Sequence, residues 1–185
     1  MKTDRGERLN AEARYISDYS PEILNGGLFI LDMGSGPGEF MELCNSYGNQ
    51  SMGIDYKVYD GSDCDKLLII KKDLRELFKH KSWPAPAFDF INCKHALGNL
   101  MKKHVIVAED YKYNKWTYSD EMAHDFYLMF RFVYCGLKPD GLFLIAAHHC
   151  LDEDIYSDYI IRQAVKSGFK LENKYSNIIH KFRKI

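Results

Sequence analysis

A glycine-rich turn between an apolar run and a helix constrains the fold of this chain more than any other feature. The segment is Leu31-Asp-Met-Gly-Ser-Gly-Pro-Gly38, and Pro37 is a typical opening residue for the helix that follows. Gly34, Gly36 and Gly38 accept positive φ angles and leave the main chain open to a ligand. A charged or polar end of that ligand can then lie near the N–H groups at the helix start.

The rest of the chain alternates short apolar runs with amphipathic stretches, the pattern of β-α-β units around a parallel sheet. Only Ser176 and Asn177 join the last two runs, too few residues for a crossover helix, so we predict an antiparallel strand there. We therefore predict one doubly wound α/β domain over residues 1–185, with a mostly parallel sheet of about seven strands. The predicted strands are Leu28–Leu31, Ser51–Ile54, Leu67–Ile70, Phe88–Cys93, Gly141–Ala147, Lys170–Tyr175 and Ile178–Arg183. The predicted helices are Arg8–Tyr19, one opened by Pro37, Met122–Val133 and Ile155–Ser167.

Composition agrees with one folded domain. The chain has 185 residues, of which 46% are hydrophobic and 28% charged, so it can bury a core and does not have the composition of a disordered chain. Its net charge of −1 provides no global field that would attract nucleic acid or an anionic membrane. The basic clusters alternate with acidic residues, so solvated faces explain them best, with an RNA-binding stripe as the alternative.

The cysteines and the N-terminus bear on the cellular setting. The five cysteines are odd in number and none is spaced as C-x-x-C, so we expect neither a disulfide framework nor a metal site. The N-terminal decapeptide MKTDRGERLN is polar and lacks an apolar signal region. The apolar runs are too short to span a bilayer. We expect a soluble cytoplasmic protein with no membrane partner.

Three acidic residues follow the ends of the first three predicted strands or lie within them. Asp32 precedes the first glycine of the turn by two positions and can accept hydrogen bonds from a cationic amino group. Asp55 comes about 20 residues after the turn, where a carboxylate can accept both hydroxyls of a ribose. Asp73 follows the third strand and can accept a hydrogen bond from the exocyclic amine of an adenine. Because parallel strands end at one edge of a sheet, these acids and the turn predict a single ligand cradle.

In combination, these segments resemble the class I S-adenosylmethionine-dependent methyltransferases of the small-molecule type, which have a Rossmann-like fold. One departure from the dinucleotide-binding pattern G-x-G-x-x-G favours this family, because Glu39 stands where that pattern requires glycine. The similar segments follow the order of the family and cover about Leu28 to Ala147. They are Asp32–Gly38, Gly53–Asp55, Lys72–Leu74, Phe88–Leu97 and Leu137–Leu144.

The resemblance implies S-adenosyl-L-methionine as the cofactor and assigns roles by position. Asp55 would bind the ribose and Tyr56 would lie against the adenine, while Asp73 and the backbone of Leu74 would read the adenine ring. Lys94 would offer main-chain contacts near the sulfonium. The methionine end would be held by Asp32, Gly34, Ser35, Gly36 and Gly38.

The implied reaction is methyl transfer to an oxygen or nitrogen of an unidentified acceptor, for which we expect a small molecule. His95 lies near the expected methyl position and could deprotonate or orient a hydroxyl, although a histidine hydrogen-bonded at the sheet edge explains it equally well. The strand end Asn92-Cys-Lys-His95 lacks the N-P-P-Y signature, which disfavours a DNA base amine as acceptor.

Acceptor contacts are expected from segments outside the cradle. We regard residues 1–24 as an N-terminal helical cap and residues 100–119 as a possible lid. The candidate acceptor residues, each with plain packing as the alternative, are Tyr15, Tyr19, Trp116 and His148. Three other functions stay open: a non-catalytic partner subunit that keeps the cradle, an RNA methyltransferase, and an aminopropyl transferase that uses decarboxylated cofactor. The sequence does not predict the oligomeric state.

Overall fold

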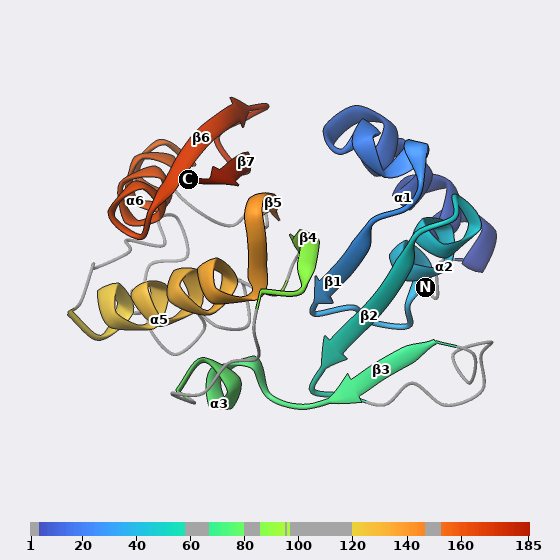
Figure 1. The fold of residues 1–185 in the computed structure, drawn as a ribbon, viewed down its shortest axis with the longest axis horizontal. Helices are drawn as coiled ribbons and strands as arrows, with labels where there is room; N and C mark the ends of the chain where they lie inside the picture. Colours follow the sequence, from blue (N-terminus) through green and yellow to red (C-terminus); the bar gives the residue numbers. More distant parts are fainter. Residues whose placement is uncertain (1–3, 58–66, 80–85, 95, 97–119, 147–152) are drawn as a thin grey trace, which may run out of the picture.

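The computed structural model describes residues 4–57, 67–79, 86–94, 96, 120–146 and 153–185. Within them, seven strands form one sheet in the order β3-β2-β1-β4-β5-β7-β6 (Figure 1). The strands are β1 Phe29–Met33, β2 Gln50–Asp55, β3 Leu68–Lys71, β4 Phe88–Lys94, β5 Leu137–Ala146, β6 Phe169–Lys174 and β7 Ile179–Lys184. The helices are α1 Arg5–Tyr19, the 3₁₀ helix η1 Pro21–Asn25, α2 Glu39–Ser46, α3 Leu74–Lys79, α5 Asp120–Gly136 and α6 Glu153–Lys166.

The predicted sheet is confirmed. Strands β1 to β5 pair in parallel, whereas β7 is antiparallel to both β5 and β6. Helix α3 and the short η1 were not predicted, because each is only five or six residues long and shows no clear apolar period. No helix in the described part of the chain is long and apolar enough to cross a membrane.

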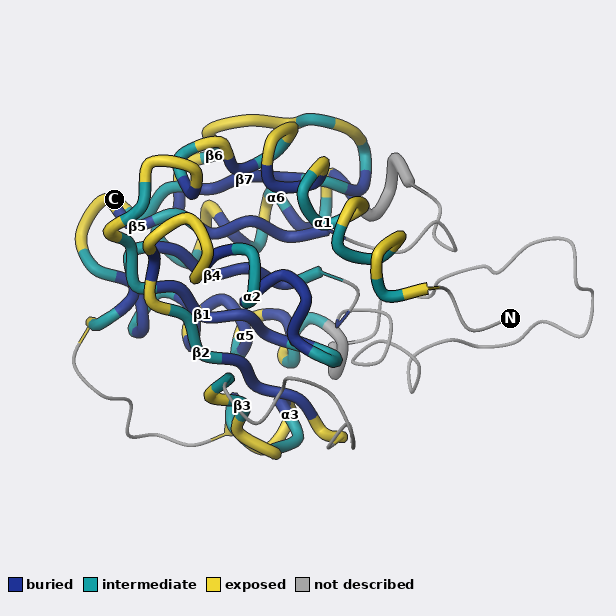
Figure 2. Tube along the Cα trace, turned by 90° about the vertical axis from the view of Figure 1, so that its right-hand side faces the viewer, coloured by how far each residue is buried: buried dark blue, intermediate teal, exposed yellow. Residues whose placement is uncertain are grey.

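Helices cover both faces of the sheet, and the central strands are buried between them (Figures 1 and 2). Alternate residues of a strand point to opposite faces, so Ile30 and Phe90 pack beneath α1 and α2 while Leu31 and Ile91 face α5. This two-sided burial explains why the central strands read as nearly continuous apolar runs in the sequence. A polar residue within such a strand is therefore exceptional.

The turn Lys138–Gly141 lies inside β5 and not before it. Leu137 already pairs with Phe88, after which the register shifts and pairing resumes at Leu142. Asp140 has a φ of 61°, which places it in the left-handed region. The prediction of a strand beginning at Gly141 was therefore too short, because a register shift admits turn residues without ending the ladder.

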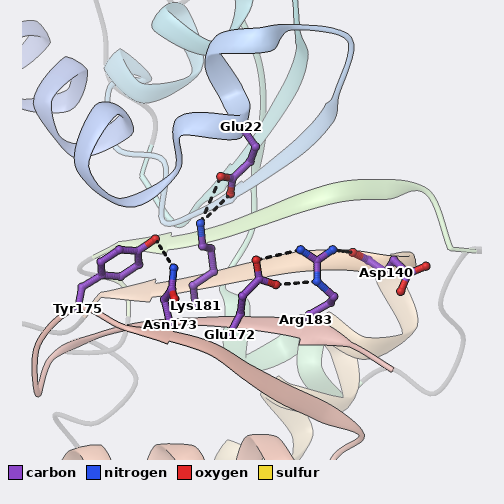
Figure 3. Close-up of polar contacts among 7 residues, drawn as sticks. All are labelled: Glu22, Asp140, Glu172, Asn173, Tyr175, Lys181 and Arg183. Carbon is purple, nitrogen blue, oxygen red and sulfur yellow. Dashed lines mark hydrogen bonds and ion pairs between the residues drawn. The ribbon is translucent and has the colours of Figure 1, made fainter.

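The N-terminal segment is fastened to the C-terminal strands (Figure 3). Lys181 of β7 is 4% exposed and its Nζ donates to both carboxylate oxygens of Glu22 in η1, at 3.3 and 3.2 Å. Arg183 on the same strand donates to Glu172 of β6 and to the carbonyl oxygen of Asp140. The Lys181–Glu22 contact holds η1 against the face of the sheet that α1 also covers, whereas the Arg183 contacts join β7 to β6 and to the turn within β5.

Helix α1 is tied to α2 and β4 by polar contacts along one helix face. Arg5 pairs with Glu42 at 2.7 Å, and Arg8 pairs with Glu39 at 2.6 Å. One turn further along, Glu12 accepts a 2.7 Å hydrogen bond from Lys94 at the end of β4. These positions recur at intervals of three and four residues, so they share the face that meets the sheet.

Candidate functional site

The glycine-rich turn follows β1 and has the backbone conformation predicted for it. The φ angles of Gly34, Gly36 and Gly38 are 80°, 55° and 96°. Gly34 donates to the carbonyl oxygen of Ile54 at 2.7 Å, and a Cβ on it would lie 2.6 Å from the Cβ of Ala96. A Cβ on Gly36, in contrast, would meet no described atom within 4 Å. The turn therefore packs against the protein at Gly34 and borders open space at Gly36.

Ser35 faces the sheet. Its buried Oγ has no hydrogen-bond partner among the described residues and lies over Gly53 of β2, 2.5 Å from where a Cβ on that glycine would stand. Gly53 thus leaves room for the turn to lie on β2. In this arrangement Ser35 offers its backbone to the turn and directs its hydroxyl toward β2.

Asp55 joins the end of β2 to the glycine-rich turn. Its Oδ2 accepts a 2.9 Å hydrogen bond from the backbone N–H of Gly36, and its Oδ1 accepts one of 2.9 Å from the N–H of Lys57. Its carbonyl oxygen accepts from the N–H of Lys72 after β3. A carboxylate has about four acceptor positions, so Asp55 retains capacity for further hydroxyl donors.

Asp32 is a buried acid at the end of β1. It is 3% exposed, and its Oδ1 accepts a 2.8 Å hydrogen bond from Nδ2 of Asn92, its register partner on β4. The pKa of Asp32 is raised to about 7, mainly by burial and also by the charges of Glu12 and Asp55, while the hydrogen bond from Asn92 and the charge of Lys94 act to lower it. Ionisation of Asp32 therefore costs free energy, and a positive group close to the carboxylate would reduce that cost.

Tyr15 extends this network to α1. Its hydroxyl donates to Oδ1 of Asn92 at 3.1 Å, and burial raises its pKa well above the usual value. The side chain of Lys94 reaches back to α1, where its Nζ lies 4.3 Å from the centre of the Tyr15 ring. The Tyr15 hydroxyl is therefore engaged inside the protein, while Lys94 pairs in the β4–β5 ladder through its main chain.

Asp73 lies near the end of β3 and caps α3. Its carboxylate accepts from the backbone N–H of Arg75 at 2.9 Å and from the Arg75 guanidinium at 3.0 and 3.1 Å. These hydrogen bonds lower the pKa of Asp73. The side chain of Leu74 joins the core, whereas Tyr56 is 51% exposed with Nζ of Lys57 5.2 Å from its ring centre.

The remaining predicted site residues separate into two groups. Tyr19 is described, and its ring packs edge-on against Tyr15 at 5.3 Å and against Tyr175 at 5.1 Å, which links α1 to the end of β6. The possible lid, residues 100–119, lies outside the described residues. So do His95, Trp116 and His148.

Asn92 and Glu12 are the two site residues that the sequence analysis did not assign. Asn92 carried a usable signal, because it is a polar residue within the apolar run of a central strand, as Asp32 is within β1. Glu12 carried none. Its pairing with Lys94 depends on how α1 docks, 82 residues away along the chain.

Comparison with known proteins relates this geometry to a fold. No protein-family model and no curated protein matches the chain by sequence. Among solved structures, a TehB-like S-adenosylmethionine-dependent methyltransferase of Corynebacterium glutamicum matches with a TM-score of 0.60 at 20% identity, over 98% of this chain and 95% of that one. The 1,6-didemethyltoxoflavin-N1-methyltransferase of Burkholderia thailandensis, solved with S-adenosylhomocysteine, matches with a TM-score of 0.56 at 11% identity, over 100% and 91%.

A third similar structure is named as a cyclase and not as a methyltransferase. The 4+2 cyclase SpnF matches with a TM-score of 0.55 at 16% identity, over 89% of this chain and 58% of that one. At such identities the likeness concerns the fold, which can carry more than one chemistry. By its strand order, its antiparallel β7 and these neighbours, the chain has the fold of the class I S-adenosylmethionine-dependent methyltransferases.

Proposed function

We propose that this protein binds S-adenosyl-L-methionine and transfers its methyl group to an oxygen or nitrogen of a small molecule. The observation that carries the proposal is the hydrogen bond between Gly36 and Asp55, because it brings a ribose-accepting carboxylate and an open glycine turn to one place. Asp32 follows on the adjacent strand, so the acid for the amino end of the cofactor lies at the same edge of the sheet.

The residues present fit the proposed cofactor. Open space beside Gly36 leaves the turn accessible, since even a Cβ there would meet nothing described within 4 Å. A cationic ammonium group would stabilise the ionised form of the buried Asp32. Asp55 has acceptor capacity beyond its two backbone partners, which suits a pair of ribose hydroxyls.

The protein's contribution to the reaction is binding, alignment and exclusion of water. The cofactor supplies an already activated methyl group on a sulfonium, so no strong acid–base machinery is required. Asp32 and the turn hold the amino-acid end, and Asp55 holds the ribose. Asp73, the backbone of Leu74 and the exposed ring of Tyr56 take the adenine, with Asp73 sharing its carboxylate between the adenine amine and Arg75.

The acceptor end of the site is assigned to residues around α1 and the sheet edge. The main chain of Lys94 lies near the transferred methyl group, and His95 next to it is the candidate base for a hydroxyl acceptor. Tyr19 is the last residue of α1 and packs against Tyr175 after β6, and we assign its ring to contact with the acceptor. Trp116 and His148 complete this proposed set.

A small-molecule acceptor is favoured over RNA for two reasons. The net charge of −1 provides no attraction for a phosphate backbone, and the Burkholderia neighbour is named as a methyltransferase of the compound 1,6-didemethyltoxoflavin and was solved with that compound bound. The non-catalytic subunit and the RNA methyltransferase are the rival functions. Both would keep the cofactor site, so binding alone does not distinguish them from the proposed enzyme.

Two measurements test the proposed function. Calorimetry with S-adenosylmethionine and S-adenosylhomocysteine should show binding of both. Transfer of a radiolabelled methyl group into a cell extract, separated into small-molecule, protein and RNA fractions, should then place the label in the small-molecule fraction. Label in RNA, or tight binding with no labelled product, would favour one of the rivals. Absence of binding would contradict the proposal itself.

A further inference from the structure

A buried chain of hydrogen bonds connects the first helix to the acid at the end of β1. The hydroxyl of Tyr15 donates to Oδ1 of Asn92 at 3.1 Å, and Nδ2 of Asn92 donates to Oδ1 of Asp32 at 2.8 Å. Asn92 is 1% exposed and Tyr15 is 6% exposed. These three side chains come from α1, β4 and β1, so the chain exists only when α1 is docked on the sheet.

The direction of these hydrogen bonds matters. A carboxamide has one acceptor end and one donor end, and the Tyr15 proton occupies the acceptor end of Asn92. The donor end therefore faces Asp32, which suits an ionised carboxylate. Without the Tyr15 hydroxyl the amide could rotate and present its oxygen to Asp32, an arrangement that only a protonated carboxyl accommodates.

We propose that Tyr15 is a positioning residue that acts through Asn92 to hold Asp32 as the acceptor for the ammonium group of the cofactor. This inference rests on the function proposed above. It replaces the acceptor contact predicted for Tyr15 from the sequence with a role inside the protein. It also makes cofactor binding depend on the docking of α1, because Tyr15 reaches Asn92 only from that helix.

The charges around Asp32 partly cancel, so the hydrogen bond from Asn92 contributes substantially to stabilising the ionised form of Asp32. From α1, Glu12 disfavours ionisation of Asp32, as Asp55 does from the end of β2; Lys94 favours it. Lys94 is itself paired with Glu12, so part of its effect is offset. Among the described residues, the other titratable groups that interact with Asp32 are neutral, and their pKa values are raised by burial and also by the charge of Asp32; they are Tyr15, Cys44 and Cys93.

The first test is the Tyr15→Phe substitution, which keeps the ring and removes only the hydroxyl. Calorimetric titration with S-adenosylmethionine between pH 6 and pH 9 should show about fivefold weaker binding at pH 7. The ratio of the mutant and wild-type Kd values should approach one at pH 9, where Asp32 is ionised in both proteins. A ratio that is constant with pH, or equal to one throughout, would overturn the proposal.

A matched control separates the hydrogen bond from the docking of α1. Glu42→Gln removes the ion pair with Arg5 that fastens the same helix and leaves Tyr15, Asn92 and Asp32 untouched. Its Kd should stay within about twofold of the wild-type value, as expected when a half-exposed ion pair is removed. If Glu42→Gln weakened binding as much as Tyr15→Phe, with the same pH profile, docking alone would explain the result.

A second readout needs no cofactor. In protein labelled with ¹³C at the aspartate carboxyls, the NMR titration midpoint of Asp32 should rise in Tyr15→Phe. In an Asn92→Ala background the same substitution should have no further effect, because the connecting amide is gone. An unchanged midpoint would overturn the role of Tyr15. A raised midpoint in a protein that binds no S-adenosylmethionine would instead refute the proposed function and leave this network standing.

Discussion

The backbone N–H of Gly36 donates a 2.9 Å hydrogen bond to Oδ2 of Asp55, which ties the glycine-rich turn after β1 to the end of β2. Gly36 and Asp55 thus fix each other's positions. The same carboxylate is the group that we assign to the ribose. Loop conformation and cofactor binding are therefore coupled through one side chain, and substitutions at either residue should affect both.

The first prediction concerns Gly36 and has a matched control in Gly48. Both glycines have positive φ angles, 55° and 82°, and a Cβ on either would meet no described atom within 4 Å. Each change to alanine should therefore cost about 1 kcal/mol of folding stability through the left-handed backbone. Only Gly36→Ala should weaken S-adenosylmethionine binding, because its methyl group occupies the space beside the turn.

Urea denaturation and calorimetry check this pair of variants. Equal loss of affinity in both would indicate a general effect of destabilisation. Unchanged affinity in Gly36→Ala would mean that the cofactor does not lie against this turn.

The second prediction is that Asp55→Asn weakens cofactor binding at least tenfold. The amide loses the charge that favours ribose hydroxyls, and its NH₂ group faces an N–H donor where the carboxylate had an oxygen. Asp89→Asn is the control. Asp89 likewise accepts a hydrogen bond from a backbone N–H, that of Phe29, but it lies near the first residue of β4, at the edge of the sheet away from the proposed site. Calorimetry should show normal affinity in that variant, and an equal loss in both would remove Asp55 from the site.

The third prediction is that Asp32→Asn stabilises the protein at pH 8 while weakening cofactor binding. The folded pKa of Asp32, about 7, lies above its usual value of 3.8, so its contribution to stability is present below the usual value and is lost as the pH rises through 7. Asparagine does not titrate and keeps an oxygen for Asn92. The gain at pH 8 should reach up to about 4 kcal/mol.

Urea denaturation at pH 5 and pH 8 measures this effect, and the gain should be smaller at pH 5. A variant that is less stable than the wild type at pH 8 would show that Asp32 is already stabilised as an anion without cofactor.

The fourth prediction concerns His180, which is fully buried on β7 with Nε2 2.9 Å from Oγ of Ser157. Burial, and then the charge of Lys174, lower its pKa to about 4. Between pH 6.5 and pH 4 the imidazole of His180 is therefore protonated in the unfolded chain but neutral in the folded protein. The free energy of unfolding falls over this pH range, by up to about 3 kcal/mol. His180→Gln should lose less stability than the wild type between pH 7 and pH 4.5 in urea denaturation. Parallel losses in the two proteins would contradict this assignment.

The sequence predicted most of the sheet because the necessary signals are local. Central strands appear as apolar runs, such as the one that ends at Leu31, and the short connection at Ser176–Asn177 excludes a crossover helix. The glycine-rich turn was equally clear, since the three positions that need a positive φ angle are all occupied by glycine. Short or irregular elements were less accessible, as the register shift within β5 shows.

The sequence alone thus determined the strands, the turn and the positions of three acids along the chain. Only the tertiary structure decided the partners of two of these acids, which are Asn92 for Asp32 and the N–H of Gly36 for Asp55. The partner of Asp73, in contrast, is Arg75, two residues along the chain. Strand register sets the contact between Asn92 and Asp32, which joins residues 60 positions apart on adjacent strands. Such contacts depend on how elements pack, and packing is a property of the whole core that no local pattern encodes.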